Sequence, residues 1–247
     1  MRGLLLKVWS SILDMVYPER ERCFNCGARL FFPEIKGLCP ECLRKIDFIN
    51  YYCLHCGRVI SPEKPALCRL CRSKPFNFNL ARSVALYDGM MRELILKFKY
   101  GHILELKEPL SELLTLYFHH YYDNYRIDYL IPIPLHAKRE EERGYNQAGI
   151  LADSLGKKCG IPVLTGALLR IKNSQPLYNL GPEERDRVIR GSFALADREK
   201  IKDKVILLID DILTTGATVN EASLVLKEKG GIKSVYVLTL ATGRIQD

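Results

Sequence analysis

Short apolar runs alternate with amphipathic stretches from residue 79 onward. The most continuous run, residues 205–209, is too short to span a membrane and too apolar for an exposed strand, so it predicts a buried parallel strand. The same patterning predicts further strands at 82–87, 129–134, 167–171, 193–196 and 234–240, and helices at 90–100, 108–122, 143–158 and 219–229. Strands alternating with helices predict an α/β fold, with a mainly parallel sheet flanked by helices and ligands at the carboxyl ends of the strands.

The first residues of the chain follow a helical pattern. Apolar side chains recur at helical spacing over residues 4–15, which predicts an amphipathic helix. We expect it to dock on the body of the protein rather than on a membrane surface, because few basic residues flank it. No stretch approaches the roughly 20 apolar residues of a transmembrane helix, and Asp14 without a small-residue cleavage site argues against a signal peptide. A cytoplasmic protein is expected, with the inner face of the membrane as a second location.

Candidate chemistry gathers in residues 205–218, VILLIDDILTTGAT. The predicted strand ends on two carboxylates, and a hydroxyl-rich loop follows before the helix at 219–229. Unpaired backbone N–H groups and the helix dipole favour an anion such as phosphate at a turn of this kind. The residues concerned are Asp210, Asp211, Thr214, Thr215, Gly216, Ala217 and Thr218.

The two carboxylates narrow the class of ligand. A carboxylate accepts hydrogen bonds from hydroxyl groups but repels phosphate, so this combination indicates a ligand with both groups, such as a sugar phosphate. Neighbouring strand residues point to opposite faces, so Asp210 and Asp211 can reach one ligand only if the strand stops between them. We therefore predict that regular pairing ends near Asp210. The alternative is an ordinary strand-to-helix turn, in which the Asp and Thr side chains only cap the helix.

Eight of the nine cysteines form four Cys-x-x-Cys pairs. Two such pairs can complete a tetrahedral zinc shell. Disulfides need an oxidising compartment and a redox dithiol needs one pair, so zinc is favoured over both. Two sequential ribbons are favoured over a cross-brace, which the sequence leaves open. The predicted ligands are Cys23, Cys26, Cys39 and Cys42 for one ion, and Cys53, Cys56, Cys68 and Cys71 for the other.

These pairs define a small amino-terminal module, which we place at residues 1–78, ahead of a larger domain at 79–247. Metal binding should supply much of the folding energy of the module, because it is too small to be held by burial alone. The ninth cysteine, Cys159, stands apart and is expected to be a buried small hydrophobe.

The formal net charge of +8 is concentrated in the cysteine-rich part, since residues 1–80 hold 13 Lys and Arg against 7 Asp and Glu. Eight thiolates with two zinc ions would lower that charge by about four, which weakens the argument for a nucleic-acid partner. Zinc ribbons often contact nucleic acid or protein, but solvated surface is the expectation for the basic residues near the second cysteine set. They are Arg58, Arg69, Arg72 and Lys74.

A second candidate binding segment follows the strand at 129–134. Lys138, Arg139 and Arg143 lie past that strand, and arginine binds phosphate oxygens through two parallel hydrogen bonds, so one interpretation is a diphosphate site. The other is a solvated charged turn, because acids within the segment balance its bases.

Residues 173–189 predict a long mobile loop, because they combine Pro176, Gly181 and Pro182 with many charges. Loops of that size are often functional. A lid over a reacting centre is one such use.

The order of motifs resembles a known family. The apolar run, the two aspartates and TTGAT look like the phosphoribosyl pyrophosphate (PRPP) motif of type I phosphoribosyltransferases. The whole order is similar to the ComF family of bacterial competence proteins, which join a double zinc ribbon to a phosphoribosyltransferase domain. Besides the cysteine pairs, the matching motifs are KFKYG (97–101), IPIPLH (131–136), RGYNQ (143–147), Gln175, Arg185 and GSF (191–193). Val188 departs from the family pattern, where an asparagine is usual.

The resemblance implies a type I phosphoribosyltransferase-like fold with a PRPP site. In such a site Asp210 and Asp211 bind the ribose hydroxyls, residues 214–218 hold the 5′-phosphate, and Mg²⁺ accompanies the diphosphate. Catalysis would displace pyrophosphate from C1 of the sugar. No residue of the sequence stands out as a reader of a nucleobase.

The family also implies a part in natural transformation, with single-stranded DNA and a competence helicase as partners; nucleobase salvage is the alternative. Binding of single-stranded DNA uses basic grooves and aromatic platforms. Two tyrosines, Tyr100 and Tyr145, lie among basic residues, whereas Phe98 is expected in the core. The basic residues are Lys97, Lys99, Arg139 and Arg143.

Overall fold

The computed structural model describes residues 22–30, 33–63, 66–73, 75–101, 103–172 and 182–244, without the side chains of residues 182, 183, 185 and 186. The predicted amino-terminal helix lies outside these ranges, as do Lys74, Gln175 and residues 173–181 of the predicted lid. Within the described ranges, no helix has the length and apolar composition that a membrane crossing requires.

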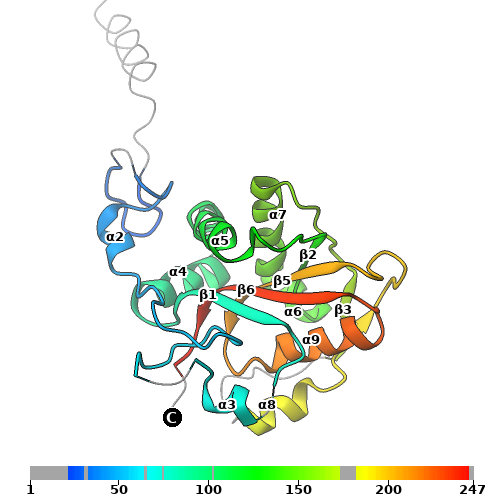
Figure 1. The fold of residues 1–247 in the computed structure, drawn as a ribbon. Coiled ribbons are helices and arrows are strands. Elements are labelled where there is room, and N and C mark those ends of the chain that lie inside the picture. Colours follow the sequence, from blue (N-terminus) through cyan, green and yellow to red (C-terminus); the bar gives the residue numbers. More distant parts are fainter. Residues whose placement is uncertain are drawn as a thin grey trace, which may run out of the picture.

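Four parallel strands form the central sheet, in the order β1-β6-β5-β2 (Figure 1). In that order the strands span Leu80–Leu86, Ser234–Thr242, Val205–Leu213 and Tyr129–Pro132. The central strands β5 and β6 are largely apolar and buried, because helices cover both of their faces. The predicted α/β fold with a mainly parallel sheet is confirmed.

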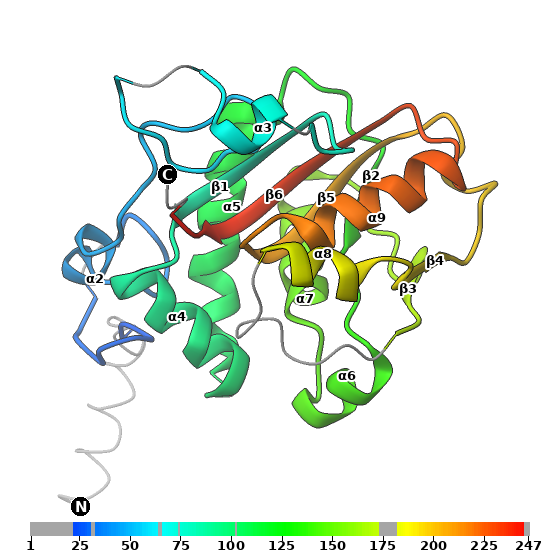
Figure 2. The same ribbon diagram turned by 90° about the horizontal axis from the view of Figure 1, so that it is seen from below.

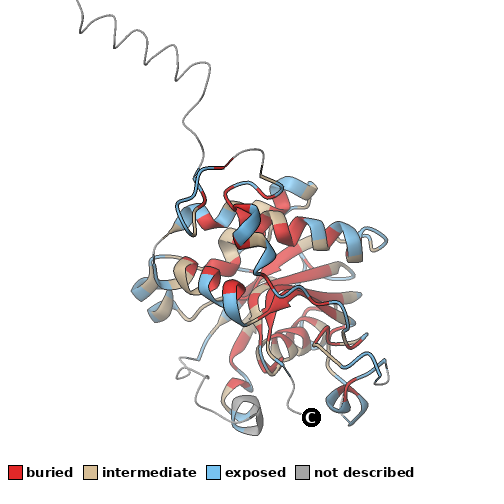
Figure 3. Ribbon diagram, turned by 90° about the vertical axis from the view of Figure 1, so that its left-hand side faces the viewer, coloured by how far each residue is buried: buried red, intermediate tan, exposed pale blue. Residues whose placement is uncertain are grey.

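Helices flank the sheet on both sides (Figures 1 and 2). One face carries α4 (Gly89–Tyr100), α5 (Lys107–Tyr122) and α7 (Gln147–Cys159), with the short helix η1 (Leu104–Leu106). The other face carries α9 (Ala217–Glu228), which α8 (Pro182–Ile189) contacts, beside an antiparallel pair, β3 (Leu168–Arg170) and β4 (Phe193–Leu195). Alternate β5 residues supply the two cores, so the buried sheet separates helices whose outer faces are exposed (Figure 3).

Two segments that the sequence predicts as irregular are helical. The basic segment forms α6 (Ala137–Arg143), and α8 occupies the second part of the predicted loop at 173–189. His136 caps α6 by accepting a 3.3 Å hydrogen bond at Nδ1 from the N–H of Lys138, and Gly144 ends it with a φ of 80°. Asn146 then caps α7, so α7 begins at Gln147 rather than at residue 143. These caps escape a search for periodicity because α6 buries no side chain.

Strand β5 is longer than the sequence predicts. Its pairing with β6 continues through Asp210 to Leu213, where Thr242 Oγ1 donates a 2.8 Å hydrogen bond to the Leu213 carbonyl. The prediction that regular pairing ends near Asp210 is therefore wrong on this side, because β6 supplies a partner along the whole strand. Pairing with β2 does end before Asp210, since the last bond runs from the Ile133 N–H to the Ile209 carbonyl at 2.9 Å.

The two cysteine sets pack on opposite faces of the sheet. The first joins the core beneath α4, and the second joins the core beneath α9. The connector between them, residues 47–49, runs antiparallel along β1. Along it the Leu86 N–H donates to the Asp47 carbonyl at 2.9 Å and the Ile49 N–H donates to the Val84 carbonyl at 3.3 Å. The connector therefore covers the edge of the sheet, which would otherwise expose unpaired backbone groups.

Each cysteine set contributes one short helix, α2 (Pro40–Arg44) in the first and α3 (Arg69–Ser73) in the second. The second set also bonds to β1, because the Ala81 N–H donates to the His55 carbonyl at 2.8 Å. Arg69 and Arg72 are exposed as predicted. Arg58 is only 3% exposed, so the expectation of a solvated side chain is wrong for this residue. The division of the chain near residue 78 stays a prediction.

Gly57 allows this close approach. A Cβ at Gly57 would collide with the Ala81 carbonyl oxygen, and its φ of 69° favours glycine. We expect Gly57→Ala to lower the free energy of unfolding by about 2 kcal/mol or more. Gly27, at the equivalent position of the first set, has a φ of 73° but no atom within 4 Å of its Cβ position. Gly27→Ala should therefore cost only about 1 kcal/mol. Equal losses in denaturant titrations of the zinc-loaded variants would contradict this explanation.

Candidate functional site

The loop after β5 opens the first turn of α9. Gly216 is the N-cap residue, with a φ of 81°, and it makes no side-chain cap. Thr215 Oγ1 accepts a long hydrogen bond of 3.4 Å from the Ala217 N–H. The first turn contains no acidic residue. The start of α9 thus offers backbone donors and the positive end of the helix dipole. Binding of an anion at residues 214–218 stays a prediction.

The two aspartates of β5 lie on opposite faces of the sheet. Asp211 is 9% exposed and forms an ion pair with Lys99 of α4, with 2.5 Å between Nζ and Oδ2. Asp210 points to the face of β3, where it acts electrostatically on Arg170. Both carboxylates are therefore present at the end of the sheet, but the strand does not stop between them. Of these two aspartates, only Asp211 has a basic partner at ion-pair distance among the described residues.

Asp210 is held in an unfavourable environment for a charged carboxylate. Burial, followed by the negative charge of Asp211, raises the pKa of Asp210 to about 7. The charge of Lys99, the 2.8 Å hydrogen bond from the Asp211 N–H and the charge of Arg170 act in the opposite direction. A carboxyl group with a pKa near neutrality, at the carboxyl ends of parallel strands, is a common feature of ligand-binding sites.

Arg170 is a neighbour of Asp210 that the sequence patterning did not single out. It ends β3, and its guanidinium lies 5.8 Å from the centre of the Phe193 ring. Burial, followed by the charge of Arg139, lowers the pKa of Arg170, whereas Asp210 raises it. The predicted basic segment thus brings the charge of Arg139 close to Arg170. Because β3 is short and lies outside the main sheet, no periodic signal marks Arg170 in the sequence.

The motifs at 97–101 and 143–147 pack against each other. Arg143 donates from Nη2 to the Tyr100 hydroxyl at 2.9 Å and from Nη1 to Gln147 Oε1 at 2.8 Å, and its guanidinium lies 4.9 Å from the Tyr100 ring. The Tyr145 hydroxyl donates to the Phe98 carbonyl. Phe98 is fully buried, as predicted. Arg143 is therefore positioned by aromatic and amide partners.

The remaining predicted residues lie at or near the surface, including Cys159, for which the expectation of a buried side chain holds only in part. Lys138 is exposed on α6. Tyr100 is 60% exposed, so its ring is accessible next to Arg143. Cys159 is half-buried, and burial raises the pKa of its thiol to about 11.

The cysteines gather in the two sequential sets that the spacing favours. Within each set the four sulfur atoms lie within 4.8 Å of one another. The sets are Cys23, Cys26, Cys39 and Cys42, and Cys53, Cys56, Cys68 and Cys71. Backbone N–H groups point at sulfur in both, from Cys42 to Cys39 at 3.4 Å and from Cys68 to Cys53 at 3.3 Å. Four thiolates with N–H donors fit tetrahedral zinc.

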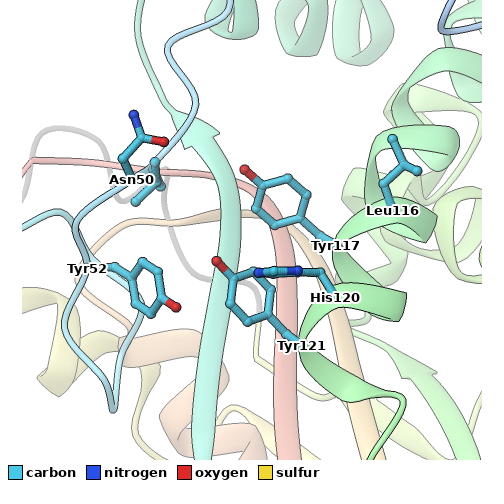
Figure 4. A pocket seen from close by; sticks show the side chains of 7 residues that line it. Asn50, Tyr52, Leu116, Tyr117, His120 and Tyr121 are labelled. Carbon is cyan, nitrogen blue, oxygen red and sulfur yellow. The ribbon is translucent and has the colours of Figure 1, made fainter.

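A separate hollow of about 500 Å³ lies between the connector of the cysteine sets and α5. Figure 4 shows Tyr52 on the connector side, facing Tyr117, His120 and Tyr121 of α5. His119 and His120 are exposed, and His119 pairs with Asp123 at 2.9 Å. None of the predicted binding residues lines this hollow.

Two family models match this chain, one over the cysteine-rich part and one over the carboxyl-terminal part. One, described as "Double zinc ribbon domain", matches residues 12–73, and the other, "Phosphoribosyl transferase domain", matches residues 141–246. The chain therefore combines a double zinc ribbon with a phosphoribosyltransferase-type α/β domain. The purine phosphoribosyltransferase from Pyrococcus horikoshii is a structural neighbour, with 17% identity, a TM-score of 0.36, and coverage of 54% of this chain and 73% of that one.

Relatives of similar length define the family more narrowly. Competence protein ComFC of Bacillus subtilis is 30% identical over 92% of this chain and 87% of its own length. Competence protein F of Haemophilus influenzae is 29% identical, with coverage of 89% and 96% respectively. DNA utilization protein YhgH of Escherichia coli is 26% identical, with coverage of 82% and 89%. The chain belongs to the ComF family of competence proteins.

The raised pKa of Asp210 predicts a pH-dependent cost to stability. In the folded state the carboxyl keeps its proton up to about pH 7, whereas its unperturbed value is 3.8. The folded protein thus binds more protons than the unfolded chain across this window, so Asp210 destabilises the fold increasingly as the pH rises through it. Asp210→Asn should raise the free energy of unfolding more at pH 8 than at pH 5.5, by about 1–2 kcal/mol.

The matched control is Asp211→Asn. It leaves Lys99, which is 13% exposed, without its carboxylate, so it should lower stability at both pH values. Denaturant titrations of both zinc-loaded variants measure the effect. A gain for Asp210→Asn that does not change between the two pH values would show that Asp210 is not the group responsible.

Proposed function

We propose that this protein binds PRPP with Mg²⁺ and single-stranded DNA, and that it acts in DNA uptake during natural transformation. The observation that carries the PRPP proposal is the start of α9, which has no side-chain cap and follows the strand β5 that carries Asp210 and Asp211. The raised pKa of Asp210 supports it. An anion cradle next to a carboxyl group suits a ligand with phosphate and hydroxyl groups. The relatives, which are competence and DNA utilization proteins, support the biological role.

In this proposal, different residues around the carboxyl ends of the strands bind different parts of PRPP. Residues 214–218 hold the 5′-phosphate, and Asp210 and Asp211 accept hydrogen bonds from the ribose hydroxyls. Arg139, Arg143 and Lys138 contribute positive charge on the diphosphate side, and Arg170 adds to it from β3. The only groups of three or more metal-ligating side chains in the described part of the chain are the two cysteine sets. Mg²⁺ would therefore arrive on the diphosphate oxygens, which it prefers as ligands.

If the domain retains transfer activity, the reaction breaks the bond between C1 of the ribose and pyrophosphate and forms a bond from C1 to an acceptor. The protein would orient the groups and stabilise charge rather than supply a nucleophile. Nucleobase salvage is the second candidate function, and the phosphoribosyltransferase family model favours it.

Binding of single-stranded DNA would use the exposed ring of Tyr100 beside Arg143. Stacking on an aromatic ring tolerates any base, and a neighbouring guanidinium attracts the phosphate backbone. Lys97 and Lys99 contribute less, because Lys97 bonds Asn25 Oδ1 at 2.8 Å and Lys99 pairs with Asp211. A cytoplasmic location and a competence helicase as partner belong to the same proposal.

The PRPP proposal predicts a loss of affinity in Asp210→Ala/Asp211→Ala. Titration calorimetry with PRPP and Mg²⁺ should show binding by the wild type and at least a tenfold weaker affinity in the double variant, because the ribose contacts are lost. Asp197→Ala, at an exposed aspartate near Lys200, is the control and should bind as the wild type does. Equal affinity of all three proteins would refute the assignment of the two aspartates.

The DNA proposal predicts binding of single-stranded oligonucleotides that weakens steeply with salt. Tyr100→Ala should lower this affinity by about tenfold through lost stacking, whereas Tyr100→Phe should keep most of it. Fluorescence anisotropy with labelled oligonucleotides measures both. Pyrophosphate release that starts only when one particular nucleobase is added, without DNA binding, would favour salvage instead.

A further inference from the structure

The second cysteine set brings an arginine side chain to the start of α9. Arg58 is 3% exposed, and its Nη2 lies 3.1 Å from the position that a Cβ would occupy at Gly216. The Phe76 ring lies under the guanidinium, 5.5 Å from its carbon, and also reaches the same side of Gly216. The zinc ribbon therefore lies directly against Gly216, the N-cap residue of α9.

Two hydrogen-bond donors of Arg58 lack a partner. Nε and Nη2 are both buried and make no hydrogen bond within the described residues. A buried charge without hydrogen bonds is costly, so such a group indicates a partner that binds separately. Arg82, a buried arginine nearby, also has a buried Nε without a hydrogen bond, but its Nη1 donates to the Leu54 carbonyl at 3.0 Å and the Ala81 carbonyl at 2.7 Å.

The neighbourhood of Arg58 favours an anion as that partner. The N-cap of α9 provides no side-chain acceptor, and its first turn contains no carboxylate. A helix amino terminus and a guanidinium that meet at one turn both attract negative charge, and guanidinium pairs especially well with phosphate oxygens.

The segment between the ribbon and β1 holds this arrangement in place. Asn220 Oδ1, on α9, accepts hydrogen bonds from the Asn77 backbone N–H at 2.7 Å and from the Asn77 side chain at 3.0 Å. Phe76 stacks on Phe78 with ring centres 4.9 Å apart, and His55 packs against both rings. Arg58 therefore approaches the loop from a fixed direction.

We propose that Arg58 donates hydrogen bonds from Nε and Nη2 to the phosphate monoester of the ligand held at residues 214–218. This inference rests on the proposed PRPP site and extends it, because one wall of the phosphate site then belongs to the zinc ribbon. The second zinc ion supports phosphate binding indirectly, by fixing the turn that carries Arg58.

A different use of Arg58 is to balance the charge of the zinc site. Four thiolates and Zn²⁺ carry a net charge of −2, and Cys56 lies two residues before Arg58 in the sequence. Charge balance requires no contact with a phosphate. The two roles therefore separate in binding experiments on zinc-loaded protein.

The experiment compares zinc-loaded, full-length wild type with Arg58→Met, Arg58→Lys and Arg69→Met. Arg69 is exposed on the same ribbon and provides the matched control. Titration calorimetry uses ribose 5-phosphate and PRPP with Mg²⁺, and metal analysis checks the zinc content. We expect Arg58→Met to bind ribose 5-phosphate at least tenfold more weakly, Arg58→Lys about threefold more weakly, and Arg69→Met within twofold of the wild type, with zinc content unchanged.

Wild-type affinity in Arg58→Met would overturn the inference, whether or not zinc content changes. If Arg58→Met does not fold, Arg58→Lys decides, because lysine keeps the charge but lacks the two-donor geometry; an unchanged affinity then overturns the inference. If the wild type binds neither ligand, the proposed PRPP site fails and this inference fails with it. If binding by the wild type depends on Asp210 and Asp211 but not on Arg58, only this inference fails.

Discussion

The parallel pairing of β5 with β6 is the constraint on which the rest of the structure depends. Both strands are nine residues long, and they pair from Val205↔Ser234 to Leu213↔Thr242. Parallel strands need crossovers, and buried parallel strands need cover on both faces. The flanking helices meet that need. Because all four strands run in one direction, the segments that follow β1, β2 and β5 begin at the same end of the sheet, where the strands have their carboxyl ends. The candidate residues lie at this end.

At the carboxyl ends of the strands, two neighbouring negative charges oppose folding. Lys99 forms an ion pair with Asp211, which is one of two adjacent carboxylates. The other carboxylate, Asp210, is buried next to the negative charge of Asp211, and both effects raise its pKa to about 7. Stability alone would favour an uncharged residue at this position. An unfavourable carboxyl group at the mouth of a parallel sheet is consistent with selection for binding, because a ligand with hydroxyl groups can supply the missing hydrogen bonds.

The zinc ribbons are integrated with the α/β domain. Apart from Cys26, which is exposed, their cysteines belong to two different cores, one on each face of the sheet, and their connector pairs with the edge strand β1. Metal binding that orders these small modules therefore also stabilises packing on both sides of the sheet. The first set is linked to α4 through Asn25, which accepts from Lys97 and donates to Met90 sulfur at 3.3 Å. The second contacts α9 and its N-cap residue through Arg58, Phe76 and Asn77.

The sequence by itself determined the features that depend on local pattern. Continuous apolar runs identified the buried strands, and cysteine spacing identified two sequential sets. The acids near the end of β5, followed by hydroxyls and a glycine in the next loop, identified the helix start. Three features depended on tertiary structure. Asp210 continues in the strand because β6, a distant segment, supplies its partner. Arg170 and Arg58 gain their importance from neighbours on other elements, Asp210 and Gly216. Contacts of this kind join segments that are remote in the sequence, and a pattern along one strand or helix contains no record of them.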